Sequence, residues 1–254
     1  MKKLITAAAL GTALLAATPA LAEDGLTATT GIDWSKGDYG TGQDTEILIV
    51  PFSLRYKTGD LRMSATVPWL RIDGSSAIVG DGNGGVVIDP NAPRTVRSGF
   101  GDVNLGVAYA IPEDRLGFGL ELNGRVKLPT AKASRGLGTG KADFAVGAEL
   151  SKSFGAVTPF VSGGYRIVGK PAGIALHDAW YGSAGASLAM GKSVLIASYD
   201  YREATSNFSR DSQELFGAFS TPLTSRLNFT LYGSAGLTKG APDVGVGSMI
   251  GVKF

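Results

Sequence analysis

The sequence predicts an all-β protein, namely a transmembrane antiparallel up-and-down β-barrel of about twelve strands. Three observations support this fold. The chain contains about twelve segments in which apolar and polar residues alternate, each long enough for a tilted membrane strand. The connections between these segments are short and long in turn. Almost every charged residue within a segment has the same parity, so one face of each predicted strand is apolar.

The first 22 residues have the pattern of a secretory signal peptide. Lys2 and Lys3 precede an apolar run over residues 4–17, and Ala20-Leu21-Ala22 fits an A-x-A cleavage site. The apolar run is too short to cross a bilayer as a helix. We therefore expect residues 1–22 to be removed during export and residues 23–254 to form the barrel.

The composition excludes two other classes of protein. Without Lys2 and Lys3, the 24 basic residues are reduced to the same number as the 22 acidic ones, so the exported chain has almost no net charge. The sequence has no cluster of basic residues of the kind that would indicate a nucleic-acid partner. The chain has no Cys, so disulfides do not stabilise it, whereas its 37 Gly residues are spread through the alternating segments.

Taken in order, the segments alternate with a period of two, as half-buried strands do. They span residues 25–36, 44–56, 60–71, 99–111, 114–128, 142–153, 155–167, 178–190, 192–203, 212–221, 225–237 and 242–254.

The connections favour a bacterial outer-membrane barrel. Those after the even-numbered segments are short, such as Pro112-Glu113 and the single residues Gly155 and Gly191. Most of the others are longer and include residues 72–98 and 129–141. Short turns at one end, long loops at the other and both termini at the short-turn end are typical of such barrels.

Parity predicts which face meets lipid. The apolar face includes Leu54, Leu120 and Leu231, and we expect it to contact outer-membrane lipid, because a basic residue at the bilayer midplane costs about 2–4 kcal/mol. The opposite face should line the lumen. Its candidate residues are Arg55, Arg62, Asp102, Glu121, Arg125, Lys127, Asp143, Glu149, Arg166, Asp200, Arg202, Glu214 and Arg226. Parity alone also fits a soluble barrel with its charges outside, but the signal peptide, the loops and Phe254 favour the membrane.

Aromatic residues fall at both predicted membrane interfaces. Trp34, Trp69 and Trp180 lie near the long-loop rim, and Tyr56 and Tyr109 near the short-turn rim with Phe254. The closing strand with its final Phe also resembles the C-terminal signal that the barrel-assembly machinery recognises. We expect that machinery to be a partner during biogenesis.

The predicted interior is polar and nearly neutral, so we expect weak ion selectivity. Neighbouring strands place Arg125 and Lys127 near Asp143, and Arg202 near Glu214, so these charges are expected to pair. Twelve strands lie between packed small barrels and open porins. Inward Gly residues either keep the bore open or relieve strand curvature. The predicted inward glycines are Gly106, Gly117, Gly119, Gly147, Gly185, Gly245 and Gly247.

Two glycine-rich loops invite other interpretations. Residues 72–98 are the best candidate for a lid or an inward constriction, and their "DGNGG" lacks the spaced acidic ligands of a calcium loop. The "GLGTG" at 136–140 lacks the Lys-Ser/Thr ending of a phosphate loop. We predict no metal and no cofactor.

Catalysis is a weaker hypothesis. His177 is the only histidine, and its neighbour Asp178 should point to the opposite face of the strand. A serine would have to converge on it to form a hydrolase triad. We predict that the protein is not an enzyme.

Two stretches, "SGFGDVNLGVAYAIP" (98–112) and "LPTAKASRGLGTGKADFAVGAELSKSFG" (128–155), resemble the outer-membrane proteins of the putative MetA-pathway of phenol degradation family. The resemblance implies a barrel that passes aromatic or other small hydrophobic compounds, with Asp102 as an inward acid at the channel mouth. It implies no catalytic residues.

These expectations combine into an outer-membrane channel for the passive uptake of small solutes, including aromatic compounds. The alternative is a structural or surface-interaction barrel with an occluded lumen, and a membrane hydrolase comes third.

Overall fold

The computed structural model describes residues 24–76, 78–79, 86–87 and 93–254, so the predicted signal peptide at 1–22 lies outside the described residues. Strands dominate this part of the chain. In order, the elements are β1 (Gly25–Gly37), β2 (Thr45–Thr58), β3 (Leu61–Ser75), β4 (Ile78–Val79), β5 (Val86–Val87), β6 (Arg94–Phe100), β7 (Val103–Ile111), α1 (Glu113–Leu116), β8 (Gly119–Leu128), the 3-10 turn η3 (Ala133–Arg135), β9 (Asp143–Ser151), β10 (Val157–Ile167), β11 (Ala179–Met190), β12 (Ser193–Arg202), β13 (Ser212–Pro222), β14 (Leu227–Gly236) and β15 (Val244–Lys253).

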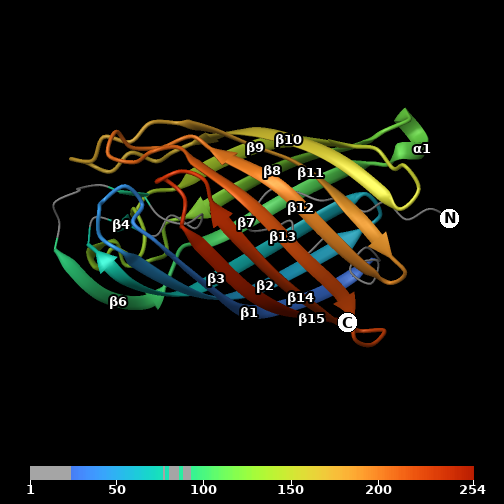
Figure 1. Cartoon of the computed structure of the whole chain (residues 1–254), viewed down its shortest axis with the longest axis horizontal. Helices are drawn as coiled ribbons and strands as arrows, with labels where there is room; N and C mark the ends of the chain where they lie inside the picture. Colours follow the sequence, from blue (N-terminus) through green and yellow to red (C-terminus); the bar gives the residue numbers. More distant parts are fainter. Residues whose placement is uncertain (1–23, 77, 80–85, 88–92) are drawn as a thin grey trace.

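All of these strands except β4 and β5 form a closed antiparallel barrel, which confirms the predicted fold class; β4 and β5 pair with each other in a separate two-stranded sheet. The barrel strands follow one another around the wall in sequence order, and β1 pairs with both β2 and β15, which closes the wall. β6 and β7 follow one another and both pair with β3, so the described strands of the barrel occupy twelve positions. Figure 1 shows the C-terminus and α1 at one end, and β4 and β6 at the other. Within the described residues, no helix is long and apolar enough to cross a membrane.

The fourth wall position contains a β-bulge. Thr66 of β3 pairs with Asn104, and Trp69 pairs with Phe100, so the β6–β7 side has one residue more than β3 in this interval. Pro68 lies opposite the break and has no N–H with which to continue the ladder. The extra residue shifts the parity of the strand. Phe100 is therefore exposed outside, and Asp102 is buried inside.

The predicted boundaries are wrong at two places. Residues 72–98 are not all loop, because β3 continues to Ser75 and β6 begins at Arg94. The segment 114–128 does not begin as a strand, because α1 occupies residues 113–116. Gly117 ends this helix with φ 79°, and its N–H donates to the Glu113 carbonyl. Such a conformation suits Gly because it has no Cβ. Gly117 is consequently not an inward strand residue.

The tight turns at the short-turn end have a common design. Gly59-Asp60, Gly155-Ala156 and Gly191-Lys192 are two-residue connections, each with Gly first and a positive φ of 55°, 66° and 63°. A positive φ at this position matches the twist of the flanking strands. The single-residue turns predicted at Gly155 and Gly191 are therefore one residue longer.

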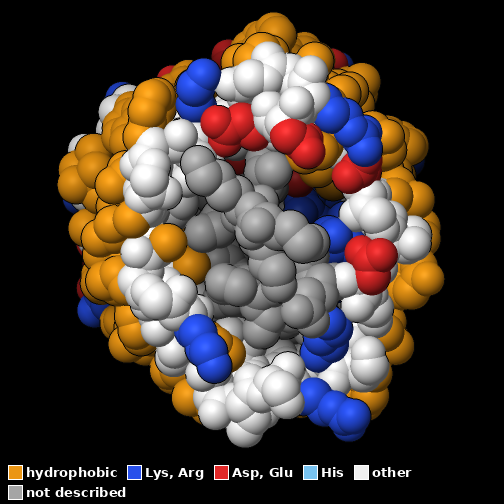
Figure 2. Space-filling model, turned by 90° about the vertical axis from the view of Figure 1, so that its right-hand side faces the viewer, with side chains coloured by type: hydrophobic (Ala, Val, Ile, Leu, Met, Phe, Trp, Pro, Cys, Tyr) orange, Lys and Arg blue, Asp and Glu red, His pale blue; other side chains and the backbone are white. Residues whose placement is uncertain are grey.

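The outer surface of the barrel is apolar. Exposed side chains include Phe52, Leu54, Leu122, Val146 and Leu231, each with roughly half of its surface accessible. Figure 2 views the end that bears α1 and the C-terminus, and it shows hydrophobic side chains around the outside and charged side chains around the rim. Because an apolar outer belt is stable in lipid and costly in water, the exposure pattern fits a membrane-spanning barrel.

Candidate functional site

The interior holds most of the charged residues that the sequence assigned to the lumen. Arg55, Asp102, Glu121, Lys127, Asp143, Glu149, Asp200 and Glu214 are buried inside the barrel, and Arg62, Arg125, Arg166 and Arg202 are partly buried. The prediction for Arg226 is wrong. Arg226 lies in the turn between β13 and β14 and is exposed, because β14 begins only at Leu227.

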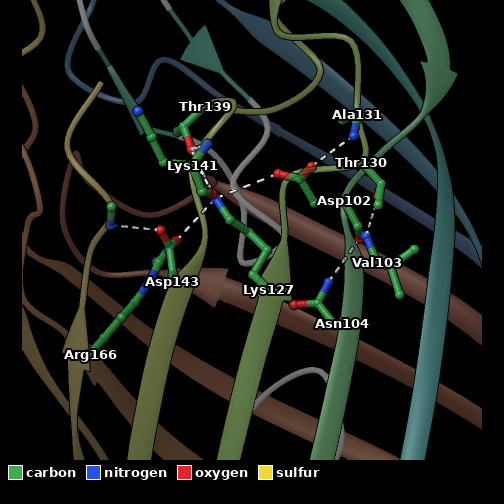
Figure 3. Close-up of polar contacts among 11 residues, drawn as sticks. Asp102, Val103, Asn104, Lys127, Thr130, Ala131, Thr139, Lys141, Asp143 and Arg166 are labelled. Carbon is green, nitrogen blue, oxygen red and sulfur yellow. Dashed lines mark hydrogen bonds and ion pairs between the residues drawn. The ribbon is translucent and has the colours of Figure 1, made fainter. Parts of the chain in front are cut away.

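A polar network lies at the long-loop end of the barrel and connects Asp102, Lys127, Asp143 and Arg166 (Figure 3). The Lys127 Nζ atom lies 3.0 Å from Asp143 Oδ2 and 3.5 Å from Asp102 Oδ2, and it donates a hydrogen bond to Thr139 Oγ1 at 3.0 Å. Arg166 donates to the same Asp143 oxygen. The Lys127 side chain is 3% exposed, so these ion pairs are shielded from water.

Each carboxylate of this network also holds a loop. Asp102 Oδ1 accepts a hydrogen bond of 2.8 Å from the Ala131 N–H, and Asp143 Oδ1 accepts one of 3.0 Å from the Gly169 N–H. Ala131 belongs to the loop between β8 and β9, and Gly169 to the loop between β10 and β11. The network therefore ties two long loops to the barrel wall by charge-assisted bonds.

The two glycine-rich motifs meet at this place. A Cβ on Gly99 would lie 2.8 Å from Leu137 Cδ1, and a Cβ on Gly138 would lie 2.6 Å from Asp102 Oδ2. Leu137 is 2% exposed. The "GLGTG" loop therefore packs onto the "GFGD" strand opening, and small residues on both sides permit the close approach.

Two further ion pairs join inward side chains of other strands. Arg62 Nη2 donates to Glu121 Oε1 at 2.7 Å, and Arg202 pairs with Glu214. The second pair was predicted from strand order. The first pair was not, because it joins β3 to β8 across the inward face of β7.

The interior also contains apolar clusters that the sequence reasoning missed. One, the lower apolar cluster, comprises Phe160, Val194, Ile196, Ala218 and Tyr232, with Phe216 and Met249 packed against it. The other, the mouth cluster, comprises Tyr39, Ile47, Ile72 and Ile78, with Ile49 beside it. The cluster members on barrel strands have the inward parity, so applying parity to apolar as well as charged residues would have predicted them. The interior is therefore less polar than expected.

Ile78 shows that the loop after β3 returns to the barrel. Its side chain is fully buried against the mouth cluster, and Arg97 donates hydrogen bonds to the carbonyls of Ser75 and Ile78. This supports an inward constriction by the described part of this loop. Residues 77, 80–85 and 88–92 lie outside the described residues.

Most inward glycines do not leave open space. A Cβ on Gly147 would meet the hydroxyl oxygen of Tyr181 at 2.7 Å, and one on Gly247 would meet Tyr232 Cζ at 2.3 Å. Gly185 is covered by Phe160. Of the two interpretations of the inward glycines, widening of the bore is therefore wrong for Gly147, Gly185 and Gly247. They accept side chains from neighbouring strands, as in the aromatic covering of glycines in other sheets.

Two cavities follow the wall from β3 through β7 to β12. The upper cavity has a volume of about 80 Å³, and its polar lining includes Lys127, Asp143, Arg166, Asp200 and Arg202. The lower cavity has a volume of about 50 Å³, and its lining includes Arg62, Glu121, Asn123, Glu149 and Ser162. Arg125 and Tyr181 line both. The cavities therefore adjoin at these two residues.

The comparisons assign this architecture to a family. The family model described as "Putative MetA-pathway of phenol degradation" matches residues 35–254. The chain belongs to this family. The resemblance stated from the two glycine-rich stretches is thus confirmed over most of the chain. No curated protein sequence matches.

Solved structures resemble this MetA-pathway family member in fold. An outer membrane channel from Pseudomonas putida F1 superposes with a TM-score of 0.68 at 13% identity, covering 91% of this chain and 96% of that one. The translocator domain of the autotransporter NalP from Neisseria meningitidis gives 0.55 at 14%, covering 91% and 89%. The beta domain of the Bordetella autotransporter BrkA gives 0.55 at 11%, covering 91% and 100%. These identities establish a shared fold, that of outer-membrane barrels, and nothing finer.

His177 lies in the loop before β11 of this family member. Its ring Nδ1 lies 3.2 Å from the backbone carbonyl of Asp178, and the Asp178 carboxylate accepts a hydrogen bond from the Val168 N–H instead. The carboxylate is therefore engaged away from the imidazole. Among the described residues, no group of three or more His, Cys, Asp or Glu residues is arranged to hold a metal ion.

Proposed function

We propose that this protein is a channel of the bacterial outer membrane through which small solutes, including aromatic compounds, diffuse passively into the periplasm. The observation that carries the proposal is the pair of adjoining cavities along β3 and β7 to β12. They form a line of interior space from the long-loop end, where Arg202 and Thr205 lie, past Arg125 to Arg62.

The fold and the family support this function. A barrel with an apolar exterior presents its lumen as the polar route across a membrane. The structural relative from Pseudomonas putida is described as an outer membrane channel. The lining combines charged groups with Tyr181, which suits small solutes that have a polar group on an aromatic ring. The proposal includes no catalytic step.

Liposome swelling tests the channel. Ala145 lines the upper cavity, so Ala145→Trp should fill the passage and lower the swelling rate with small solutes at least severalfold. Ala184 is exposed on the outer face of β11 and is the matched control, so Ala184→Trp should keep the wild-type rate. Channel function predicts that wild-type vesicles swell faster than protein-free vesicles.

The alternative is a barrel with an occluded lumen that acts through its loops. The lower apolar cluster and the interior ion pairs favour it, because they fill much of the bore. Swelling rates equal to those of protein-free vesicles for both the wild type and Ala145→Trp would favour this alternative over the channel.

A further inference from the structure

Two exposed basic residues lie in turns at the short-turn end, the end that Figure 2 views. Lys192 is in the turn between β11 and β12, and Arg226 is in the turn between β13 and β14. Neither side chain forms an ion pair or a hydrogen bond with another residue in the part of the chain that the structure describes. Lys57 and Arg115 at the same end are instead paired with acidic side chains.

The two turns are neighbours, and the turn between β9 and β10 lies beside them. The Ser193 hydroxyl group donates a hydrogen bond of 2.9 Å to Thr221 Oγ1, which joins the β11–β12 turn to the end of β13. The Ala189 N–H donates one of 2.8 Å to the Ala156 carbonyl, which joins the end of β11 to the β9–β10 turn. Residues 154–156, 190–192 and 222–226 therefore form a continuous part of the rim, here called the basic arc.

The basic arc contains no acidic side chain. Residues 151–161, 186–199 and 215–231 include the arc and the strand ends beside it, and they contain no Asp or Glu. A pair of cations without a carboxylate between them attracts an anion, because no internal partner competes for their charge.

Acidic groups reach the edges of the arc and are engaged there. The Glu113 carboxylate of α1 accepts a hydrogen bond of 3.1 Å from the Ser153 N–H. At the other edge, the Lys253 N–H donates to the Arg226 carbonyl, and the Lys253 ammonium group offsets the charge of the terminal carboxylate on Phe254. The net positive charge of the arc is therefore that of its two turn cations.

Large apolar side chains are exposed in the same turns. Phe154 has 63% of its surface accessible, Leu223 has 56% and Met190 has 43%. The apolar outer surface of the barrel continues from them, since Leu195 of β12 and Phe219 of β13 are exposed and paired in register. Basic side chains bury their stems and extend their charged ends, so apolar and basic residues occur together at the boundary between acyl chains and headgroups. The arc therefore extends the lipid-facing surface to the headgroup level.

We propose that the basic arc binds the headgroups of anionic phospholipids in the periplasmic leaflet. Arg226 contacts a phosphate group through its planar guanidinium fork, and Lys192 contacts it as a point charge. Phe154 and Leu223 lie among the upper acyl carbons. A soluble acidic partner fits the arc less well, because these two apolar side chains are continuous with the surface that faces lipid. This interaction concerns the outer surface of the barrel and goes beyond the proposed passage of solutes.

Fluorescence quenching by spin-labelled lipids tests the proposal on the folded full chain. The chain has no Cys, so Ser225→Cys provides a single labelling site in the arc for a fluorophore. The labelled protein is reconstituted into symmetric phosphatidylcholine vesicles that contain a small fraction of either phosphatidylglycerol or phosphatidylcholine with a nitroxide near the headgroup. Because both leaflets have the same composition, the orientation of the barrel does not affect the result.

The labelled protein should associate with phosphatidylglycerol about fivefold more strongly than with phosphatidylcholine, which corresponds to about 1 kcal/mol. Lys192→Gln combined with Arg226→Gln should reduce this ratio to about one. Lys192→Arg combined with Arg226→Lys keeps both charges and should keep most of the preference. Lys132→Gln combined with Arg135→Gln is the matched control, because it removes two exposed basic residues from the loop between β8 and β9 at the opposite end. This control should keep the fivefold ratio.

Salt gives a second measurement that needs no substitution at the two cations. Screening of exposed charges should remove the preference at about 1 M salt, where the Debye length is about 3 Å. Equal association of both lipids at low salt would overturn the proposal and leave the arc to solvent or to a soluble partner. A preference that persists in Lys192→Gln combined with Arg226→Gln, or at high salt, would also overturn it.

Discussion

Replacement of Lys127 by Met should destabilise the barrel strongly. The Lys127 ammonium group lies between two buried carboxylates, 3.0 Å from Asp143 and 3.5 Å from Asp102. Asp143 keeps Arg166 and the Gly169 N–H after the substitution. Asp102 keeps the hydrogen bond from the Ala131 N–H, and it is 3% exposed. Most of the loss should therefore arise at Asp102.

The magnitude follows from the burial. Removing one partner of a buried ion pair typically costs about 3–5 kcal/mol, because the remaining charge is left without compensation. We expect Lys127→Met to lower the free energy of unfolding by about this amount. Replacing Asp102 by Asn as well removes the uncompensated charge, so the double variant should be more stable than Lys127→Met alone by about 1–3 kcal/mol.

Urea unfolding in lipid vesicles, followed by tryptophan fluorescence, measures both values. Lys192→Met is the matched control, since Lys192 is exposed in the turn between β11 and β12, and it should change the free energy by less than about 0.5 kcal/mol. A loss for Lys127→Met no larger than that of the control would refute the reasoning. So would a double variant that is no more stable than the single one.

Three other predictions follow from the structure. The Tyr232 hydroxyl group crosses β15 at Gly247 and donates a 2.8 Å hydrogen bond to Asp33 of β1. Tyr232→Phe should therefore cost about 1–3 kcal/mol, and Gly247→Ala should also destabilise the barrel. Both effects should lower the temperature of the heat-induced gel shift, and the idea fails if both variants shift like the wild type. Leu137→Ala should release the loop between β8 and β9 and cost about 2–5 kcal/mol, with faster hydrogen exchange confined to that loop; unchanged exchange there would contradict the packing on Gly99. The hydrogen bond from the Gly59 N–H and the Lys57 ammonium group hold the pKa of the Asp24 carboxyl below its ordinary value of 3.8. The stabilisation by the Asp24 carboxylate is therefore present above that pH and is lost as the pH falls through the lower pKa of the folded state. The melting temperature of the wild type should exceed that of Asp24→Asn at pH 7, and a difference that persists at pH 2 would argue against this role of Asp24.

The sequence by itself determined the architecture of this protein. Successive side chains on a strand point to opposite faces, so a period of two separates Leu54 from Arg55 and Leu120 from Glu121 without knowledge of any contact. Segment number and loop length are equally local properties. Arg226 was assigned wrongly because the end of a strand depends on pairing with its neighbours, and Gly117 because a short helix replaced the start of a strand.

Only the tertiary structure decided what the interior residues do. Arg62 and Glu121 lie far apart in sequence and meet because β3 and β8 flank β7, and Leu137 reaches Gly99 because a loop folds back over the mouth. The register of neighbouring strands sets which side chains share a level, and a period of two contains no information on register between strands. For this reason the sequence predicted an inside and an outside, whereas the adjoining cavities, the apolar clusters and the covered glycines required the closed barrel.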